Sequence, residues 1–294
     1  MLVRLAHQCK RLESMGGAPP VSRLVRSHVD TFRDLLESGP VVARIGSGAA
    51  QLALPNCPLA QFSAQMNALS ERHSNNLEAV MEAQQHDESK QTKEQIDMFL
   101  RVNIGIQLLS QHYVSSLKKA SKHNSDTSPH QVGVVDTPCI VSLIMEAREQ
   151  AIQLGQHHLE RVPEIHLEGL ETATVSCIPA HILHVLFEML KNSLMATASF
   201  HKRHDAVLPP VTVRVSEGLD DVTVSICDQG GGMSRRRVAL AYQYLTTSSQ
   251  LYADQEKEHR EIHSYQPATV ALSGMGIGLP VSRLYSSHFS GDLR

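Results

Sequence analysis

The spacing of apolar residues changes once along the 294-residue chain, and this change constrains the fold more than any other feature. From residue 1 to about 120, apolar side chains recur every three to four positions, which is the period of an amphipathic helix. The clearest examples are VSRLVRSHVDTFRDLLE, LAQFSAQMNALSERHSNNLEAVMEA and IDMFLRVNIGIQLLSQHYVSSL, separated by polar or glycine- and proline-bearing stretches. About four such helices, connected in this way, predict an N-terminal helical bundle.

The polar segment 118–131, KKASKHNSDTSPHQ, holds almost no large apolar residue and is predicted to connect two domains. Beyond it, the pattern predicts a helix, a strand and a second long helix, over residues 139–159, 172–178 and 180–200. The runs VTVRVS and VTVSICD then alternate with period two across the short turn EGLDD, which predicts a β-hairpin. We therefore expect a helical bundle over residues 1–130 and a mixed α/β domain over 131–294.

Composition excludes several classes of protein. The 27 basic and 30 acidic residues give a net charge of −3 with no basic stripe, which argues against nucleic-acid binding. The five cysteines form no CxxC pair, so the chain resembles neither a disulfide framework nor a zinc site, and a reducing compartment is expected. No apolar run reaches the length of a membrane span. The segment MLVRLAHQCKRLESM fits a folded amphipathic helix better than a mitochondrial presequence.

The predicted helix over 180–200 carries the first chemical motif. In FEMLKNSL, Glu188 and Asn192 are four residues apart and project from one helical face. A carboxylate and a carboxamide offer oxygen ligands suited to Mg²⁺, and the carboxylate could instead serve as a general base. A solvated helix face explains the same pair, and Lys191 is expected to be a surface lysine.

Two glycine-rich segments form the second and third motifs. DQGGGMS, residues 228–234, follows a β-branched run and fits either a hairpin tip or a bare loop where a ligand docks on backbone N–H groups. GMGIG, residues 274–278, precedes an amphipathic helix, where free N–H groups and the helix dipole favour an anion. This segment matches neither a Walker A loop nor a Rossmann loop.

The order of the three motifs is more specific than any one of them. An E-x-x-x-N helix, a strand ending in D-x-G-x-G, a long polar segment and a G-x-G-x-G helix resemble the ATP-binding domain of gyrase, Hsp90 and histidine kinases. The resemblance implies an α/β-sandwich ATP-binding domain after the bundle, lacking its last strands. It also implies that Asp228 binds the adenine amino group, that Gly230 and Gly232 let the nucleotide approach the backbone, and that GMGIG closes on the phosphates.

The resemblance extends over nearly the whole chain. GLPVSRLYSSHFSGDL looks like the corresponding segment of the pyruvate dehydrogenase kinases, more than that of the branched-chain 2-oxoacid dehydrogenase kinase, and VRLAHQCKRLES, ERHSNNLEAVMEA and HQVGVVDTPC resemble successive pieces of these enzymes. This implies a serine kinase of the mitochondrial matrix that uses ATP and Mg²⁺ to phosphorylate a 2-oxoacid dehydrogenase complex, with pyruvate dehydrogenase E1 as the first candidate substrate. The lipoyl domain of E2 is the implied docking partner, and a homodimer is the candidate assembly.

Carried over by position, the resemblance assigns a role to each site residue. Glu188 would be the base, Asn192 would hold Mg²⁺ with Lys191 nearby, and His73, in ERH, matches a bundle histidine close to the base. An ordinary bundle histidine explains His73 equally well. The implied nucleotide-binding set is Asn192, Asp228, Gly230, Gly232, Thr246, Gly274, Met275, Gly276, Ile277, Gly278 and Leu279.

The sequence departs from the family at three points, and two of them, Met195 and the end of the chain, favour a rival hypothesis. Met195 stands where the family has an arginine, so ATP binding is expected to be weaker than in a typical relative. The bundle lacks arginines that the family carries near IGIQLLSQH, which counts against docking on a lipoyl domain. The chain ends at SGDLR, where the family continues with two more strands, so we expect a fragment or an incomplete gene model. The rival is a catalytically weak relative that acts as a regulatory binding subunit. A two-component histidine kinase shares the ATP site, but GLPVSRLY points away from it.

Overall fold

The computed structural model divides the chain into two compact units, Met1–Val135 and Asp136–Arg294. It describes residues 100–112, 133–169, 172–201, 207–219, 221–244, 276–288 and 290–294, together with positions 10, 26, 27, 29, 30, 33, 97 and 115. In the first unit, residues 100–112 are helical and bury Leu100, Ile104 and Ile106, which agrees with the helical period of this segment. The rest of the expected bundle, His73 included, lies outside the described residues.

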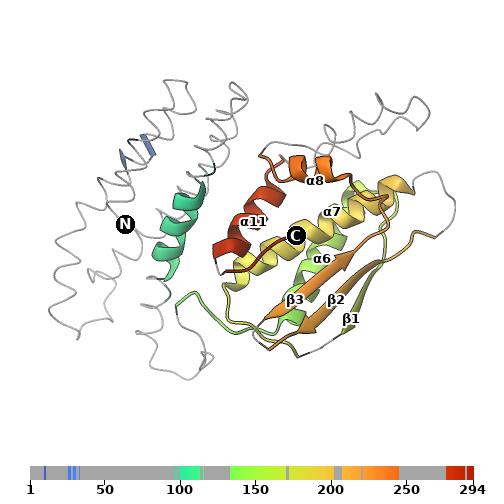
Figure 1. Cartoon of the computed structure of the whole chain (residues 1–294), viewed down its shortest axis with the longest axis horizontal. Coiled ribbons are helices and arrows are strands. Elements are labelled where there is room, and N and C mark those ends of the chain that lie inside the picture. Colours follow the sequence, from blue (N-terminus) through green and yellow to red (C-terminus); the bar gives the residue numbers. More distant parts are fainter. Residues whose placement is uncertain are drawn as a thin grey trace. The chain divides into compact units, whose positions relative to one another are not determined.

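The second unit is a mixed α/β structure built around one small sheet. Its described elements are α6 (Ile140–His158), β1 (Ile165–Gly169), α7 (Pro179–Phe200), β2 (Val211–Glu217), β3 (Val222–Cys227), α8 (Arg235–Ala241) and α11 (Gly278–His288). The described strands are ordered β1-β2-β3, with β1 parallel to β2 and β2 antiparallel to β3. Helices α6 and α7 lie together over one face of this sheet, and α11 packs on α7 (Figure 1).

Buried and exposed residues alternate along β2, and this alternation shows which face of the sheet the helices cover. Val211, Val213 and Val215 are almost fully buried, whereas the residues between them point to the outer face. On that outer face the Arg214 guanidinium donates to the Glu168 carboxylate of β1 over 2.7 Å. The sheet is therefore apolar towards the helices and polar away from them, as expected for a sheet covered on one side.

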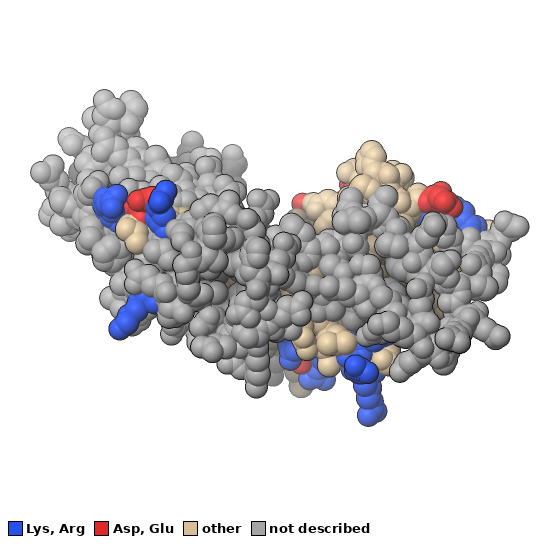
Figure 2. Space-filling model, turned by 90° about the horizontal axis from the view of Figure 1, so that it is seen from above, with Lys and Arg blue, Asp and Glu red and all other residues tan. Residues whose placement is uncertain are grey.

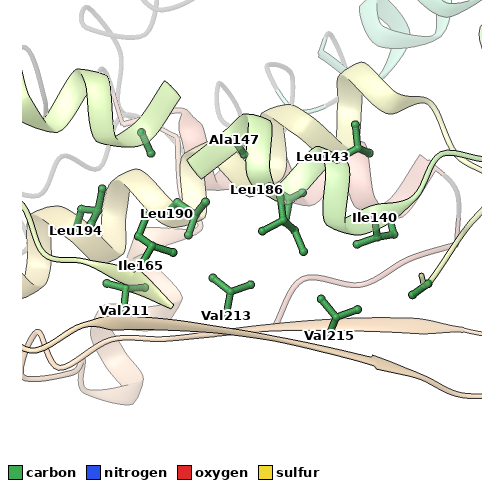
Figure 3. Packing of buried hydrophobic residues seen from close by; sticks show 13 residues of the cluster. Ile140, Leu143, Ala147, Ile165, Leu186, Leu190, Leu194, Val211, Val213 and Val215 are labelled. Carbon is green, nitrogen blue, oxygen red and sulfur yellow. The ribbon is translucent and has the colours of Figure 1, made fainter. Parts of the chain in front are cut away.

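The core is formed where the two helices meet the inner face of the sheet. Figure 3 shows leucines of α7 and apolar residues of α6 directed at the β2 valines. Leu186, Leu190 and Leu194 recur every four residues, so they form one ridge of α7, and Leu190 is 0% exposed. This ridge fixes the rotation of α7 about its own axis.

Most predicted elements of the second unit are confirmed, but one strand was misplaced. The helices over 139–159 and 180–200 and the hairpin agree with α6, α7, β2 and β3. The strand expected at 172–178 is wrong, because that segment pairs only through isolated bridges, Asp136 with Cys177 and Cys139 with Thr174. The strand is instead β1, whose sequence IHLEG has too few apolar residues to give a period-two signal.

The described cysteines are not paired in disulfides. Among the described residues, Cys139, Cys177 and Cys227 are free thiols. Burial raises the pKa of the Cys177 thiol to about 11, and the Asp136 carboxylate adds to this rise, so Cys177 stays protonated at neutral pH.

Two surface properties bear on partners. None of the helices in the described part of the chain is long and apolar enough to cross a membrane. On the face seen in Figure 2, described basic and acidic side chains lie next to one another at several places.

Replacing Leu190 by alanine should lower the free energy of unfolding by about 2–5 kcal/mol, because it leaves a cavity between α7 and the sheet. The matched control is Leu219→Ala, since Leu219 in the β2–β3 turn is 102% exposed and should change stability by less than about 0.5 kcal/mol. Urea unfolding followed by circular dichroism compares the two. Equal losses would contradict the described core.

Candidate functional site

Helix α7 carries the catalytic candidates on the side turned away from the sheet. It begins at Pro179, where proline suits the first helical position, and it ends at Phe200, after which the His201 N–H bonds the Thr197 carbonyl over 3.1 Å. Glu188 lies two residues after Leu186 in the core ridge, about 200° around the helix. Packing of that ridge therefore presents Glu188 to α11 instead of to the sheet.

Glu188 and Lys191 form a partly buried ion pair. The Lys191 Nζ donates to both carboxylate oxygens of Glu188, each over 2.7 Å, and the two side chains are only 12% and 11% exposed. The same ammonium lies 5.6 Å from the centroid of the Phe187 ring. Lys191 is thus not the surface lysine expected from the sequence. Both charges are largely desolvated, so each is stabilised by the other. Removing one partner leaves an unpaired buried charge, which destabilises the fold.

The Glu188 carboxylate also touches the beginning of α11. A Cβ placed at Gly278, the first residue of that helix, would overlap the Glu188 carboxylate. The first intrahelical bond here runs from the Val281 N–H to the Ile277 carbonyl over 2.9 Å, so the N–H groups of Gly278 and Leu279 lie in the turn that has no intrahelical acceptors. The helix dipole favours a negative group at this point, and glycine allows it to approach.

The glycine-rich loop after β3, residues 228–234, packs on the C-terminal end of α7. Gly230 comes so close to Ala196 that a Cβ would overlap it, and its N–H donates to the Asp228 Oδ1 over 2.8 Å. Gly231 and Gly232 have φ angles of 82° and 71°, which side-chain-bearing residues rarely adopt. Glycine is therefore required at position 230 by the close approach to Ala196, and at positions 231 and 232 by the left-handed backbone. The Asp228 carboxylate is exposed beside them.

Two histidines that sequence reasoning did not single out lie between α7 and α11. His181 stacks on Tyr285 with ring centroids 4.1 Å apart, and His184 meets the same ring edge-on at 5.2 Å. Burial lowers the pKa of His181 to about 4, with His288 and His184 adding to the effect. Burial also lowers the pKa of His184, which the Glu188 carboxylate opposes. The spacing of four in HVLFE could have pointed to His184, because it places this side chain one turn before Glu188.

The remaining predicted residues are placed as follows. Asn192 is half-buried on α7, one turn after Glu188, and Met195 is 5% exposed. Gly276 has a φ of 69° and Ile277 leads directly into α11. Thr246, Gly274 and Met275 lie outside the described residues, as does His73.

The donor set fits a metal held only partly by protein. Among the described residues no group of three or more histidine, cysteine, aspartate or glutamate side chains could hold a metal ion by itself. Asn192 does offer an amide oxygen beside the Glu188 carboxylate, on the helix that meets the first turn of α11. Mg²⁺ keeps several waters and is usually bound by one or two side chains together with substrate phosphates, so these residues suit it in that role.

A double-mutant cycle tests the contact between Gly278 and Glu188. Gly278→Ala alone should lower the free energy of unfolding by about 1–3 kcal/mol through overlap with the carboxylate, although alanine is the better helix former. In a Glu188→Ala background the same change should be neutral or stabilising, since the carboxylate is gone. Urea unfolding of the four proteins gives the coupling. A zero coupling energy would show that the two residues do not touch.

The buried histidines should make the fold sensitive to acid. The folded pKa of His181 lies near 4, below its ordinary value of 6.5, so the unfolded chain binds more protons and stability falls as the pH falls through that window. His181→Phe keeps the stack on Tyr285 and should save about 2–3 kcal/mol of the loss between pH about 7.5 and about 4.5. The control is Val207→Ala, at a 93% exposed side chain that does not titrate, and it should leave the slope of stability against pH unchanged. Parallel profiles for wild type and His181→Phe would refute this assignment.

Comparison with known proteins points to one family. The family model described as mitochondrial branched-chain alpha-ketoacid dehydrogenase kinase matches residues 1–136. A mitochondrial pyruvate dehydrogenase (acetyl-transferring) kinase of Schizosaccharomyces pombe is 32% identical over 79% of this chain and 55% of its own length. Its namesake in Arabidopsis thaliana is 26% identical over 99% of this chain and 77% of its own length.

A kinase isozyme 1 of the same name from Mus musculus is 33% identical over 68% of this chain and 44% of its own length. The chain thus spans about half the length of the fission yeast and mouse relatives, at 55% and 44%. The matches cover both units and their names agree in kind, so the chain is similar over both units to the mitochondrial pyruvate dehydrogenase and branched-chain 2-oxoacid dehydrogenase kinases.

Proposed function

We propose that the chain is an ATP-dependent protein serine kinase that phosphorylates a mitochondrial 2-oxoacid dehydrogenase complex, pyruvate dehydrogenase E1 first, and lowers its activity. One observation carries the proposal: three motifs far apart in the sequence gather on α7. Glu188 and Asn192 lie on the helix, Gly230 packs on its Ala196, and Gly278 packs on Glu188. The names of the relatives, all mitochondrial pyruvate dehydrogenase kinases, support it.

The architecture we propose is the one the motifs imply. Residues 1–130 form a helical bundle for regulation and partner docking, and residues 131–294 form an ATP-binding domain of the gyrase, Hsp90 and histidine kinase type. The helical residues 100–112 support the first part. A mixed sheet covered on one face by α6 and α7 supports the second.

The nucleotide would bind across the C-terminal half of α7. Asp228 would accept a hydrogen bond from the adenine amino group, beside the bare backbone of Gly230 and Gly232. Thr246 would lie in the lid against the phosphates. The N–H groups that would face the phosphates belong to residues just before and at the start of α11: Gly274, Met275, Gly276, Ile277, Gly278 and Leu279. Asn192 would hold Mg²⁺, which would offset phosphate charge when bound.

The chemistry would centre on Glu188. One carboxylate oxygen would accept the proton of the substrate serine while the hydroxyl oxygen bonds to the γ-phosphorus and the bond from that phosphorus to the leaving ADP oxygen breaks. Lys191 now occupies both Glu188 oxygens, so it must release one before the carboxylate can act as a base. The freed ammonium would then face the phosphate charge. His73, in the bundle, is proposed to lie near this base.

The wider setting follows the same reasoning. We propose the matrix as the location, the lipoyl domain of E2 as a docking partner and a homodimer as the assembly, on the strength of the resemblance. The rival function, a catalytically weak regulatory subunit, is favoured by Met195. Its side chain is apolar and 5% exposed on α7, where an arginine would have offered charge to the phosphates.

The test is transfer of labelled γ-phosphate from ATP to purified pyruvate dehydrogenase E1. Wild type should give an acid-stable phosphoserine product, and Glu188→Gln should lower kcat by about 10²–10⁴-fold with KM for ATP nearly unchanged, because only the base is lost. Asn192→Ala should chiefly raise KM for Mg·ATP. Glu146→Gln, on the exposed side of α6, is the control and should match wild type. No transfer to pyruvate dehydrogenase E1 or to its branched-chain counterpart by the folded wild type would favour the regulatory subunit instead.

Introducing the charge that Met195 lacks gives a further prediction. Met195→Arg places a guanidinium at a buried position, so without nucleotide it should lower the melting temperature. Nucleotide phosphates would supply the missing partner, so the rise in melting temperature on adding Mg·ATP should be larger than in wild type. Differential scanning calorimetry measures both effects. An equal rise in the two proteins would show that position 195 does not face the phosphates.

A further inference from the structure

The last turn of α7 holds the glycine-rich loop at three consecutive residues. The His201 Nε2 lies 3.1 Å from the Gln229 carbonyl oxygen, and because a carbonyl can only accept, the ring N–H donates. Gly230 packs on Ala196, and Gly231 packs on the Phe200 ring, whose nearest carbon would lie 2.5 Å from a Cβ at that glycine. Ala196 and Phe200 are four residues apart and form one ridge, distinct from the leucine ridge in the core.

Phe200 is in an unusual environment for so large an apolar side chain. It is 61% exposed and is absent from the hydrophobic core cluster, so its contacts stabilise a surface loop rather than the core. Its ring meets the His201 ring edge-on, with centroids 5.1 Å apart and planes at 80°. The two rings therefore support each other as they contact the loop, and we call this pair the loop clamp.

The loop clamp acts on the direction of Asp228. One carboxylate oxygen of Asp228 accepts the Gly230 N–H over 2.8 Å, so the orientation of this side chain depends on the backbone of the loop. A run of three glycines has an unusually large conformational entropy, which must be lost if the loop is to hold one shape. Contacts at Gln229, Gly230 and Gly231 restrict that freedom before any ligand arrives, which is preorganisation.

We propose that Phe200 and His201 are positioning residues that hold the loop and thereby orient Asp228 towards the adenine amino group. They set both the affinity for ATP and the preference for ATP over GTP, which lacks that amino group. This inference rests on the proposed function, since it takes Asp228 as the adenine contact. The holding of the loop itself is a property of the nucleotide-free chain.

The first measurement is amide hydrogen exchange of residues 229–233 in the nucleotide-free full chain. Phe200→Ala and His201→Ala should each speed exchange in this loop by about 3–30-fold, because local opening becomes easier. Phe200→Leu keeps an apolar side chain of similar reach, and His201→Gln keeps an N–H donor, so both should stay near wild type. Val207→Ala, which truncates a 93% exposed apolar side chain, is the matched control.

The second measurement is calorimetric binding of Mg·ATP and Mg·GTP to the same proteins. Phe200→Ala should weaken ATP binding by about 5–20-fold and lower the ATP to GTP preference, whereas a change in mere stability would affect both nucleotides alike. Unchanged exchange in both alanine variants would overturn the clamp. Faster exchange with an unchanged ATP to GTP ratio would overturn its role in orienting Asp228.

The two measurements also separate this inference from the function on which it rests. If wild type binds ATP and Phe200→Ala binds it equally well, the nucleotide role of the loop clamp fails and the proposed function stands. If wild type binds no ATP, the proposed function fails and the nucleotide role of the clamp fails with it, whatever the exchange rates show.

Discussion

The packing of α7 on the sheet is the interaction on which the rest of the second unit depends. Its leucine ridge lies on the β2 valines, and this contact sets both the height and the rotation of the helix. Everything attributed to the site follows from that rotation. The Glu188 side faces α11, and the ridge of Ala196 and Phe200 faces the glycine-rich loop. One helix thus serves as core, as carrier of the catalytic candidates and as support for the loop.

The polar groups on α7 are arranged at a cost in desolvation. Glu188 and Lys191 are largely removed from water, and each compensates the other through two short hydrogen bonds. The N-terminus of α11 adds a favourable dipole at the Glu188 carboxylate. His181 and His184 are kept neutral nearby by burial, so neither adds a positive charge beside that carboxylate at neutral pH. An incoming phosphate would meet a site whose charges are already balanced internally and must be redistributed.

Sequence reasoning was strongest where a period or a turn signal repeats. The amphipathic pattern of α7, the alternation of β2 and β3 and their short turn gave elements that the structure confirms. Reasoning failed for β1, whose five residues include only two large apolar ones, and was misled by the apolar segment 172–178. It also placed Lys191 on the surface. A one-dimensional pattern records which face a residue lies on, not which neighbour covers that face.

The site shows the same division between local and tertiary information. Spacing alone predicts that Glu188 and Asn192 share a face, yet it carries no sign that Gly278 packs on Glu188 or that Phe200 packs on Gly231, because these contacts join segments 90 and about 30 residues apart.

The thermodynamics of Mg·ATP binding to the purified chain, measured by isothermal titration calorimetry, test most directly whether the gathered motifs form a nucleotide site. The account predicts micromolar binding that is lost in Asn192→Ala and kept in Glu188→Ala. Absence of binding by the folded wild type, or its survival in Asn192→Ala, would contradict it.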